Sequence, residues 1–249
     1  MITVAQVSDV HCGSSERNLD RARRVFARLA ELARPVDAVI VTGDIADHGA
    51  PEEYEHARAM ISTLPYPVFT CPGNHDDRAN YVKILLGERP QEGPVNRAHT
   101  TSGGGAIFAL CDSTIPGEPG GHLADETLEW LDRVLTDAPD GVPVFVCFHH
   151  PPVVIHSPYL DGMRQTGGER LAALLARHDN VAAVIAGHAH TPSATVFAGL
   201  PMVIGPSVIS TLMLPWEGDE VIDEEAPAAY ALHILGDDRR LTTHYRTVL

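Results

Sequence analysis

The first third of the chain alternates between short apolar runs and amphipathic stretches. Runs of apolar and β-branched residues predict buried strands, and apolar residues spaced three and four apart predict helices that cover them. The strands are predicted at residues 2–8, 36–42 and 66–70, and the helices at 19–33, 51–64 and 77–86. This order favours parallel strands joined by helices.

The rest of the chain contains more strands and fewer helices. Residues 97–101 and 106–111 are predicted to pair across the turn of Gly103, Gly104 and Gly105. Further strands are predicted at 142–148 and 181–186, helices at 128–135 and 169–178, and four short, antiparallel strands at 195–197, 201–204, 229–235 and 241–246. The whole pattern predicts an α/β protein in which helices cover two packed sheets.

The pattern shows no internal repeat and no linker, which predicts one domain over residues 1–249. Residues 153–168 contain glycines and prolines and have little periodicity, so we expect a long loop there that could form a lid or cap. The acidic residues in 217–225 predict a solvated loop. Oligomeric state stays open, and a homodimer or a higher homo-oligomer is compatible with the sequence.

The formal net charge of −15 argues against nucleic-acid polymers as partners, because such a chain repels a phosphate backbone. The arginines of the first helix, Arg21, Arg23, Arg24 and Arg28, are predicted to form a solvated face and not a binding track. No apolar run is long enough for a membrane span, and we expect no signal peptide. Four widely spaced cysteines predict buried, reduced thiols in a cytoplasmic protein.

Aspartate, asparagine and histidine residues follow directly after the strand predicted at 66–70 and after four other predicted strands. Because parallel strands place their carboxyl ends on one rim, these residues are expected to converge. They are Asp9 and His11, Asp44, Asn74 and His75, His149 and His150, and His188 and His190. Carboxylate, imidazole and amide groups suit divalent transition metals such as Mn, Fe and Zn.

These motifs, in this order, resemble those of the calcineurin-like metallophosphoesterase superfamily. The motifs are Asp9-x-His11, Gly43-Asp44, Gly73-Asn74-His75-Asp76, His149-His150-Pro151-Pro152 and Gly187-His188-Ala189-His190. The residues after Gly43 and Gly73 are most similar to bacterial class III cyclic nucleotide phosphodiesterases and related glycerophosphodiesterases. The resemblance implies a four-layer αββα sandwich of two mixed β-sheets flanked by helices, with two divalent transition metal ions (Mn²⁺, Fe²⁺/Fe³⁺ or Zn²⁺).

The resemblance also implies a role for each site residue. One metal would be held by Asp9, His11 and His190, the second by Asn74, His149 and His188, and Asp44 would bridge them. His149 is chosen over His150 because the family ligand lies two residues before a proline. His75 would contact the substrate phosphate, with Asn74 beside it, and act as a general acid.

The reaction implied is hydrolysis of a small phosphodiester. Two metals about 3.5–4 Å apart share a water and give a hydroxide that attacks phosphorus in line. With Asp9, Asp44 and that hydroxide, the centre would carry about +1, which matches a diester monoanion. The preferred substrate is a 3′,5′-cyclic nucleotide such as cyclic AMP, and the alternatives are a glycerophosphodiester phosphodiesterase or a broad-specificity phosphatase. A more distant alternative is a metal-free scaffold or interaction protein.

Two positions depart from related patterns. Asp47 stands where purple acid phosphatases place a tyrosine ligand, so no tyrosinate-to-iron chromophore is expected. Cys12 follows His11, where a bulky apolar residue is expected; it either fills space or makes the site sensitive to oxidation. A nucleophilic hydrolase lacks support, because no Gly-x-Ser-x-Gly motif is present.

Overall fold

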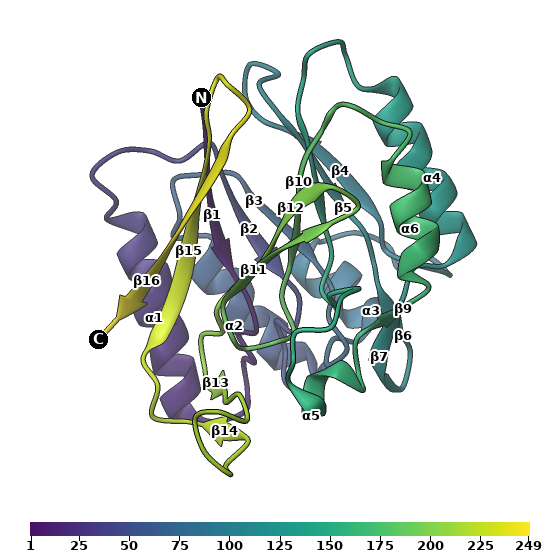
Figure 1. Cartoon of the computed structure of the whole chain (residues 1–249). Coiled ribbons are helices and arrows are strands. Elements are labelled where there is room, and N and C mark those ends of the chain that lie inside the picture. Colours follow the sequence, from purple (N-terminus) through teal and green to yellow (C-terminus); the bar gives the residue numbers. More distant parts are fainter.

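The computed structural model describes all residues from 1 to 249 and shows two packed β-sheets with helices on both outer faces (Figure 1). The first sheet has the strand order β16 (Leu241–Val248), β15 (Ala228–Leu235), β1 (Ile2–Val7), β2 (Ala38–Thr42) and β3 (Val68–Cys71). The second has the order β11 (Ser193–Phe197), β12 (Leu200–Ile204), β10 (Val181–Ala186), β8 (Val144–Cys147), β5 (Ile107–Leu110) and β4 (Arg97–Thr100).

Each sheet combines a run of parallel strands with antiparallel strands added at one end or at both. In the first sheet β1, β2 and β3 run parallel, and β15 and β16 are added antiparallel. In the second, β5, β8, β10 and β12 run parallel, and β4 and β11 are antiparallel edges. The prediction that all the late strands are antiparallel was therefore wrong for β12. The β11–β12 hairpin folds back so that β12 pairs with β10.

The helices bury their apolar sides against the outer faces of the sheets. Helices α1 (Glu16–Ala30) and α2 (Pro51–Ile61) share one core cluster with β1 and β2. Helices α4 (Asp125–Asp137) and α6 (Gly168–Leu175) share another with β5, β8 and β10. Ser15 starts α1 as an N-cap, because its hydroxyl accepts a hydrogen bond from the amide of Asn18 at 3.1 Å.

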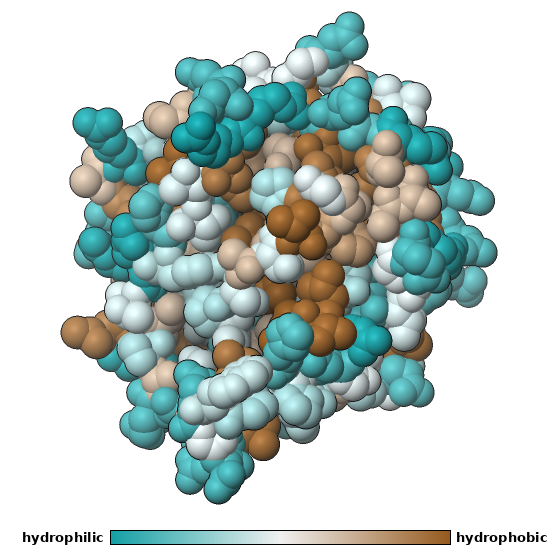
Figure 2. All heavy atoms as spheres, viewed as in Figure 1, coloured by the Kyte–Doolittle hydropathy of each residue, from teal (hydrophilic) through white to brown (hydrophobic).

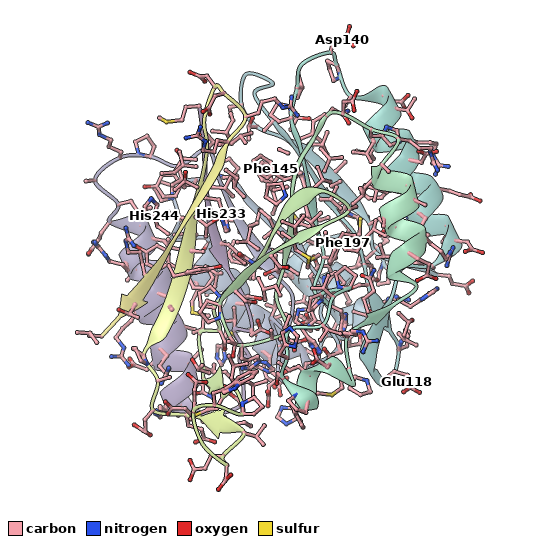
Figure 3. All side chains as sticks on the ribbon, in the orientation of Figure 1. Glu118, Asp140, Phe145, Phe197, His233 and His244 are labelled. Carbon is pink, nitrogen blue, oxygen red and sulfur yellow. The ribbon has the colours of Figure 1, made fainter.

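A third cluster lies between the sheets and holds them together. It contains Val4 and Ile40 from the first sheet and Phe108, Phe145 and Ile185 from the second. The rings of Phe108 and Phe145 stack with centroids 5.0 Å apart, and Phe145 is labelled in the interior in Figure 3. Helix, sheet, sheet and helix are therefore the four layers, and the predicted αββα sandwich is confirmed.

Several short elements were not predicted, because two to five residues carry too little periodicity to be recognised. A small sheet joins β6 (Thr114–Ile115), β7 (Glu118–His122) and β9 (Gln165–Thr166), and a second pairs β13 (Thr211–Leu212) with β14 (Ile222–Asp223). The segment 153–168 contains helix α5 (Pro158–Asp161) as well as β9. The helix expected at 77–86 is a short α3 (Arg78–Asn80) that continues as a π-helix, η1 (Tyr81–Leu85).

Arg21 is buried and does not belong to a solvated face, which corrects the prediction for the first helix. Its guanidinium donates to the carbonyl oxygens of Val208 (2.9 Å), Glu224 (3.0 Å) and Ala226. Arg17 also donates to the Glu224 carbonyl and pairs with the Glu225 carboxylate at 3.1 Å. The two arginines tie the acidic segment to α1, where sequence reasoning expected a loop in solvent.

The surface seen in Figure 2 is mostly hydrophilic, and hydrophobic residues gather near its centre between the β11–β12 hairpin and α5. None of the helices combines the length and apolar character that crossing a membrane requires. All four cysteines are free and buried, as predicted. Burial raises the pKa of the Cys12 thiol to about 12, so it stays neutral and fills space beneath the site.

Candidate metal centre

The polar residues predicted to converge do so at the carboxyl ends of five parallel strands. Asp9 and His11 follow β1, Asp44 follows β2, Asn74 and His75 follow β3, His149 and His150 follow β8, and His188 and His190 follow β10. Side-chain nitrogen and oxygen atoms crowd this end of the sheets near α5 (Figure 3). The parallel pairing of strands within each sheet, and the packing of the sheets, explain how residues 9 to 190 meet.

The backbone at this rim adopts a conformation that ordinary residues avoid. Eight residues other than glycine have positive φ angles, and five of them belong to the predicted ligand set: Asp9, His11, Asp44, His188 and His190. Left-handed backbone at a non-glycine residue costs of the order of 1–3 kcal/mol, and such residues concentrate at functional sites. These turns occur where the ligand atoms of the five residues gather.

Two loops of the site are tied to each other by Asp76. Its carboxylate accepts from the amides of Gly73, Ile45 and Ala46 at 2.8–3.2 Å. A Cβ atom placed on Gly73 would lie 2.2 Å from Asp44 Oδ1, so this position requires glycine. The last residue of the motif Gly73-Asn74-His75-Asp76 is therefore explained by loop geometry.

The first group of inward-facing atoms comes from Asp9, His11 and His190, whose ligand atoms lie within 4.8 Å of one another. His190 Nε2 is 3.5 Å from Asp9 Oδ1 and 3.3 Å from His11 Nε2. This is the set that the sequence predicts for one metal.

A second group contains Asp44, His149 and His188. His149 Nε2 lies 3.2 Å from both Asp44 Oδ2 and His188 Nδ1. Asp44 Oδ2 is also 3.6 Å from His11 Nε2, so one carboxylate oxygen lies beside both groups. That is the position which a carboxylate shared between two metal ions would require.

The outward-facing nitrogens show which ring nitrogens carry hydrogen. His11 Nδ1 lies 2.8 Å from Asp47 Oδ1, and His149 Nδ1 lies 2.7 Å from the carbonyl oxygen of Thr42. Carboxylate and carbonyl oxygens only accept, so each Nδ1 donates and each Nε2 presents a lone pair to the centre. Lone pairs and carboxylate oxygens face one another here, and a metal cation satisfies such a set.

The electrostatics of the centre indicate a shortage of positive charge. Burial raises the pKa of Asp9 to about 6 and lowers that of His188 to about 3. Although burial opposes it, the carboxylate of Asp44 raises the pKa of His149 to about 9. In the absence of a metal, a proton on His149 takes the place that a cation would fill.

His150 contacts Asn74 and is tied on both sides. Its Nε2 lies 3.1 Å from Asn74 Oδ1, and its Nδ1 lies 2.9 Å from the hydroxyl of Ser113. The nitrogens of His150 also fall within 4.8 Å of those of His149 and His188, but both already have partners. Asn74 lines the same cavity as Asp44 and His188, with its side-chain oxygen held by His150.

His75 and Asp47 occupy the open side of the centre. The His75 amide donates to Asp44 Oδ1 at 2.9 Å, and its Nδ1 donates to the carbonyl oxygen of Asp47 at 2.8 Å. The Nε2 atom is left without a protein partner on a ring that is 42% exposed and lines the cavity. Asp47, at the position of the purple acid phosphatase tyrosine, hydrogen-bonds His11.

A cavity of about 650 Å³ opens beside the centre. Four apolar side chains that line it come from segments 153–168 and 211–226, namely Leu160, Met163, Leu212 and Ile222, and Ile209 lies just before the second segment. Polar residues from the start of α1, including Ser14, Arg17 and Asn18, line it as well. Segments 153–168 and 211–226 therefore shape the pocket.

Sequence reasoning assigned no role to Ser210 or Ser113. Ser210 Oγ lies 2.9 Å from His190 Nδ1, and Ser113 Oγ contacts His150. An isolated serine carries no spacing signal, and both reach the site through loops. Their tertiary contacts alone identify them.

Comparisons with known proteins agree with this geometry. The profile of the calcineurin-like phosphoesterase family matches residues 2–192. A glycerophosphodiester phosphodiesterase of Enterobacter lignolyticus is 30% identical over 239 residues, which cover 92% of this chain and 86% of that protein. A 3′,5′-cyclic-nucleotide phosphodiesterase of Nostoc sp. is 32% identical over 196 residues, with coverage of 76% and 71%.

Among solved structures, a dimetal phosphatase from Danio rerio superposes with a TM-score of 0.75 over 100% of this chain and 96% of that one, at 16% identity. At that identity the likeness shows the fold. The family profile covers most of the chain, and the relatives at 30% identity or more extend over most of it too. The chain therefore belongs to the calcineurin-like phosphoesterase family and is a metal-dependent phosphoesterase.

Proposed function

We propose that this protein is a binuclear-metal phosphodiesterase that hydrolyses small phosphodiesters, with a 3′,5′-cyclic nucleotide as its preferred substrate. Asp9, His11 and His190 would hold one divalent transition metal ion. Asn74, His149 and His188 would hold the other, and Asp44 would be shared. His149 is preferred to His150 because its Nε2 faces Asp44 Oδ2 and His188 Nδ1 at the centre, whereas the nitrogens of His150 contact Asn74 and Ser113.

The donor set fits two such ions. Buried carboxylates, imidazole lone pairs and an amide oxygen are the ligands that Mn, Fe and Zn accept. When bound, the ions would acidify a water molecule and take up negative charge on the phosphoryl oxygens. The protein holds the histidines in the required tautomer through Asp47 and the Thr42 carbonyl, and the apolar layers behind the rim exclude bulk water.

His75 would act on the substrate directly. Its Nδ1–H is fixed by the Asp47 carbonyl, so Nε2 faces the cavity and can carry a second proton. From there it can donate a hydrogen bond to a phosphoryl oxygen or give the proton to the leaving alkoxide.

The apolar part of the cavity lining is the observation that carries the choice of substrate. Leu160, Met163 and Ile222 line a cavity that also reaches Asp44 and His188. A nucleobase offers an apolar face and a polar edge, which suits this lining together with Ser14 and Asn18. A glycerol group has no such face, and the relative from Nostoc acts on cyclic nucleotides by its name.

A glycerophosphodiester is the second candidate, and two residues favour it. Glu224 and the half-exposed ring of Tyr159 line the same cavity. A carboxylate and an aromatic face suit the ammonium group of a choline or ethanolamine headgroup. The relative from Enterobacter lignolyticus is named for this activity.

The decisive experiment is a substrate panel with Mn-loaded protein. It would contain cyclic AMP, cyclic GMP, glycerophosphocholine, an aryl diester and the matching aryl monoester. We expect kcat/KM to be highest for a cyclic nucleotide and higher for the aryl diester than for the monoester after correction for leaving-group reactivity. Metal-stripped protein is the control. A clear preference for the monoester would overturn the diester assignment.

The metal stoichiometry tests the ligand assignment. Wild-type protein reconstituted with Mn²⁺ should hold close to two ions per chain by elemental analysis. Asp44→Ala should lose both, or keep one weakly, because both sites share that carboxylate. Asp20→Ala, an exposed carboxylate on α1, is the matched control and should keep two. Two tightly held ions in Asp44→Ala would contradict the shared role.

The raised pKa of His149 predicts a stability difference with a definite sign. Folded, metal-stripped protein holds a proton on His149 up to about pH 9, whereas an unfolded histidine loses it near 6.5. The melting temperature of stripped protein should therefore fall as pH rises through that window, and the metal-loaded protein should lack this contribution because the ion replaces the proton. Thermal unfolding followed by circular dichroism measures both. His149→Gln should remove the difference in slope, and a stripped protein that gains stability over this range would contradict it.

The role of His75 can be separated from metal binding. His75→Ala should keep both ions and lower kcat by about 10²–10⁴-fold if His75 is a general acid. The loss should be large for alkyl diesters and small for nitrophenyl diesters, whose leaving groups need no proton. Asn74→Ala is the comparison, because it should weaken metal binding. An equal loss for both classes of leaving group would leave His75 with a phosphate-positioning role only.

A further inference from the structure

The predicted ligand histidine His190 differs from the others in its hydrogen-bond partner. That partner is the hydroxyl of Ser210, which can both donate and accept a hydrogen bond. His11 and His149 donate to a carboxylate and a carbonyl oxygen, whereas His190 Nδ1 lies 2.9 Å from a hydroxyl. We propose that Ser210 positions His190 by accepting its Nδ1–H, and that the Ser210 hydroxyl hydrogen then points into the cavity as a donor to a substrate phosphoryl oxygen. This inference rests on the proposed function and adds a residue to it.

The direction of the hydrogen bond follows from the other side of the His190 ring. Its Nε2 faces Asp9 Oδ1 at 3.5 Å and His11 Nε2 at 3.3 Å, which is the arrangement of a ligand lone pair. A neutral ring with its lone pair on Nε2 carries its hydrogen on Nδ1. Ser210 Oγ therefore accepts.

A hydroxyl that accepts one hydrogen bond can still donate its own hydrogen to another acceptor. The Ser210 side chain has no other hydrogen-bond partner, and the residue lines the cavity together with Asp44, Asn74 and His75. When a phosphodiester substrate binds beside the centre, one of its phosphoryl oxygens can accept this hydrogen. Charge-assisted hydrogen bonds of this kind are stronger than neutral ones.

Hydrogen bonds to neighbouring elements hold the turn that carries Ser210. Ser207 Oγ accepts from the Ile209 amide at 3.0 Å and donates to the Asp9 carbonyl at 3.3 Å. The Val208 amide donates to the Ser8 carbonyl at 3.2 Å, and buried Arg21 donates to the Val208 carbonyl at 2.9 Å. The turn is thereby tied both to the strand end that carries Asp9 and to α1.

This turn lies after residue 192, outside the part of the chain that the family profile matches. The matched part supplies the predicted ligands, and the later segment supplies the group that orients one of them. Ser210 therefore belongs to the part of the chain that completes the site outside the matched region.

Metal binding measured by calorimetric titration of stripped protein with Mn²⁺ tests the positioning role. Ser210→Ala and Ser210→Gly should bind one of the two ions about 10–100-fold more weakly, because loss of the partner frees the His190 ring. Ser210→Thr, which keeps a hydroxyl, should restore the affinity. Ser193→Ala, a nearby serine whose hydroxyl has no partner, is the matched control and should bind as wild type. Wild-type affinity for both ions in Ser210→Ala and Ser210→Gly would overturn the proposal.

Kinetics at saturating Mn²⁺ test the substrate contact separately. With both ions bound, kcat/KM of Ser210→Ala for an aryl diester should still be about 10-fold lower than that of Ser193→Ala, and Ser210→Thr should recover most of the loss. An unchanged kcat/KM would overturn the substrate contact and leave the positioning of His190 supported. If the wild type hydrolyses no diester while Ser210→Ala still binds metal weakly, the proposed substrate class fails and the positioning role stands.

Discussion

The site is dominated by one electrostatic constraint, a set of buried acceptor atoms with no donor among them. Asp44 Oδ2 lies 3.6 Å from His11 Nε2 and 3.2 Å from His149 Nε2. Such a set is unfavourable unless positive charge enters it, and the pKa of His149, raised to about 9, shows that a proton is attracted there. The packing of the surrounding layers stabilises the fold enough to hold these acceptors close together. The ligands are therefore already arranged before a cation binds.

That arrangement depends on a polar contact between the sheets directly behind the rim. Gln6 on β1 donates to Thr42 Oγ1 and to the Ala186 carbonyl, both at 2.8 Å, and so joins the end of β2 to the end of β10. Gln6 in turn accepts from buried His233, labelled in Figure 3, at 3.0 Å. The Thr42 carbonyl orients His149. The network is fully buried and paired, which favours one relative position of the two sheets.

The last part of the chain is as important to the site as the motifs are. It contributes β15 and β16 to the first sheet, the Ser207–Ser210 turn beneath His190, and the apolar side chains Leu212 and Ile222 in the cavity lining. Arg17 and Arg21 on α1 hold this segment in place. The chemistry of the centre and much of the shape of its pocket are thus supplied by different parts of the sequence.

The sequence by itself determined the layers, most strands and helices, and the residues that meet at the rim. It could do so because strand and helix periodicities are local, and because parallel strands place their carboxyl ends together whatever their distance in sequence. The pairing of β12 with β10, the burial of Arg21 and the partners of the histidines were decided by tertiary structure. These depend on contacts between distant segments, such as Ser210 with His190, and a single serine or arginine has no periodicity from which such a contact could be foreseen.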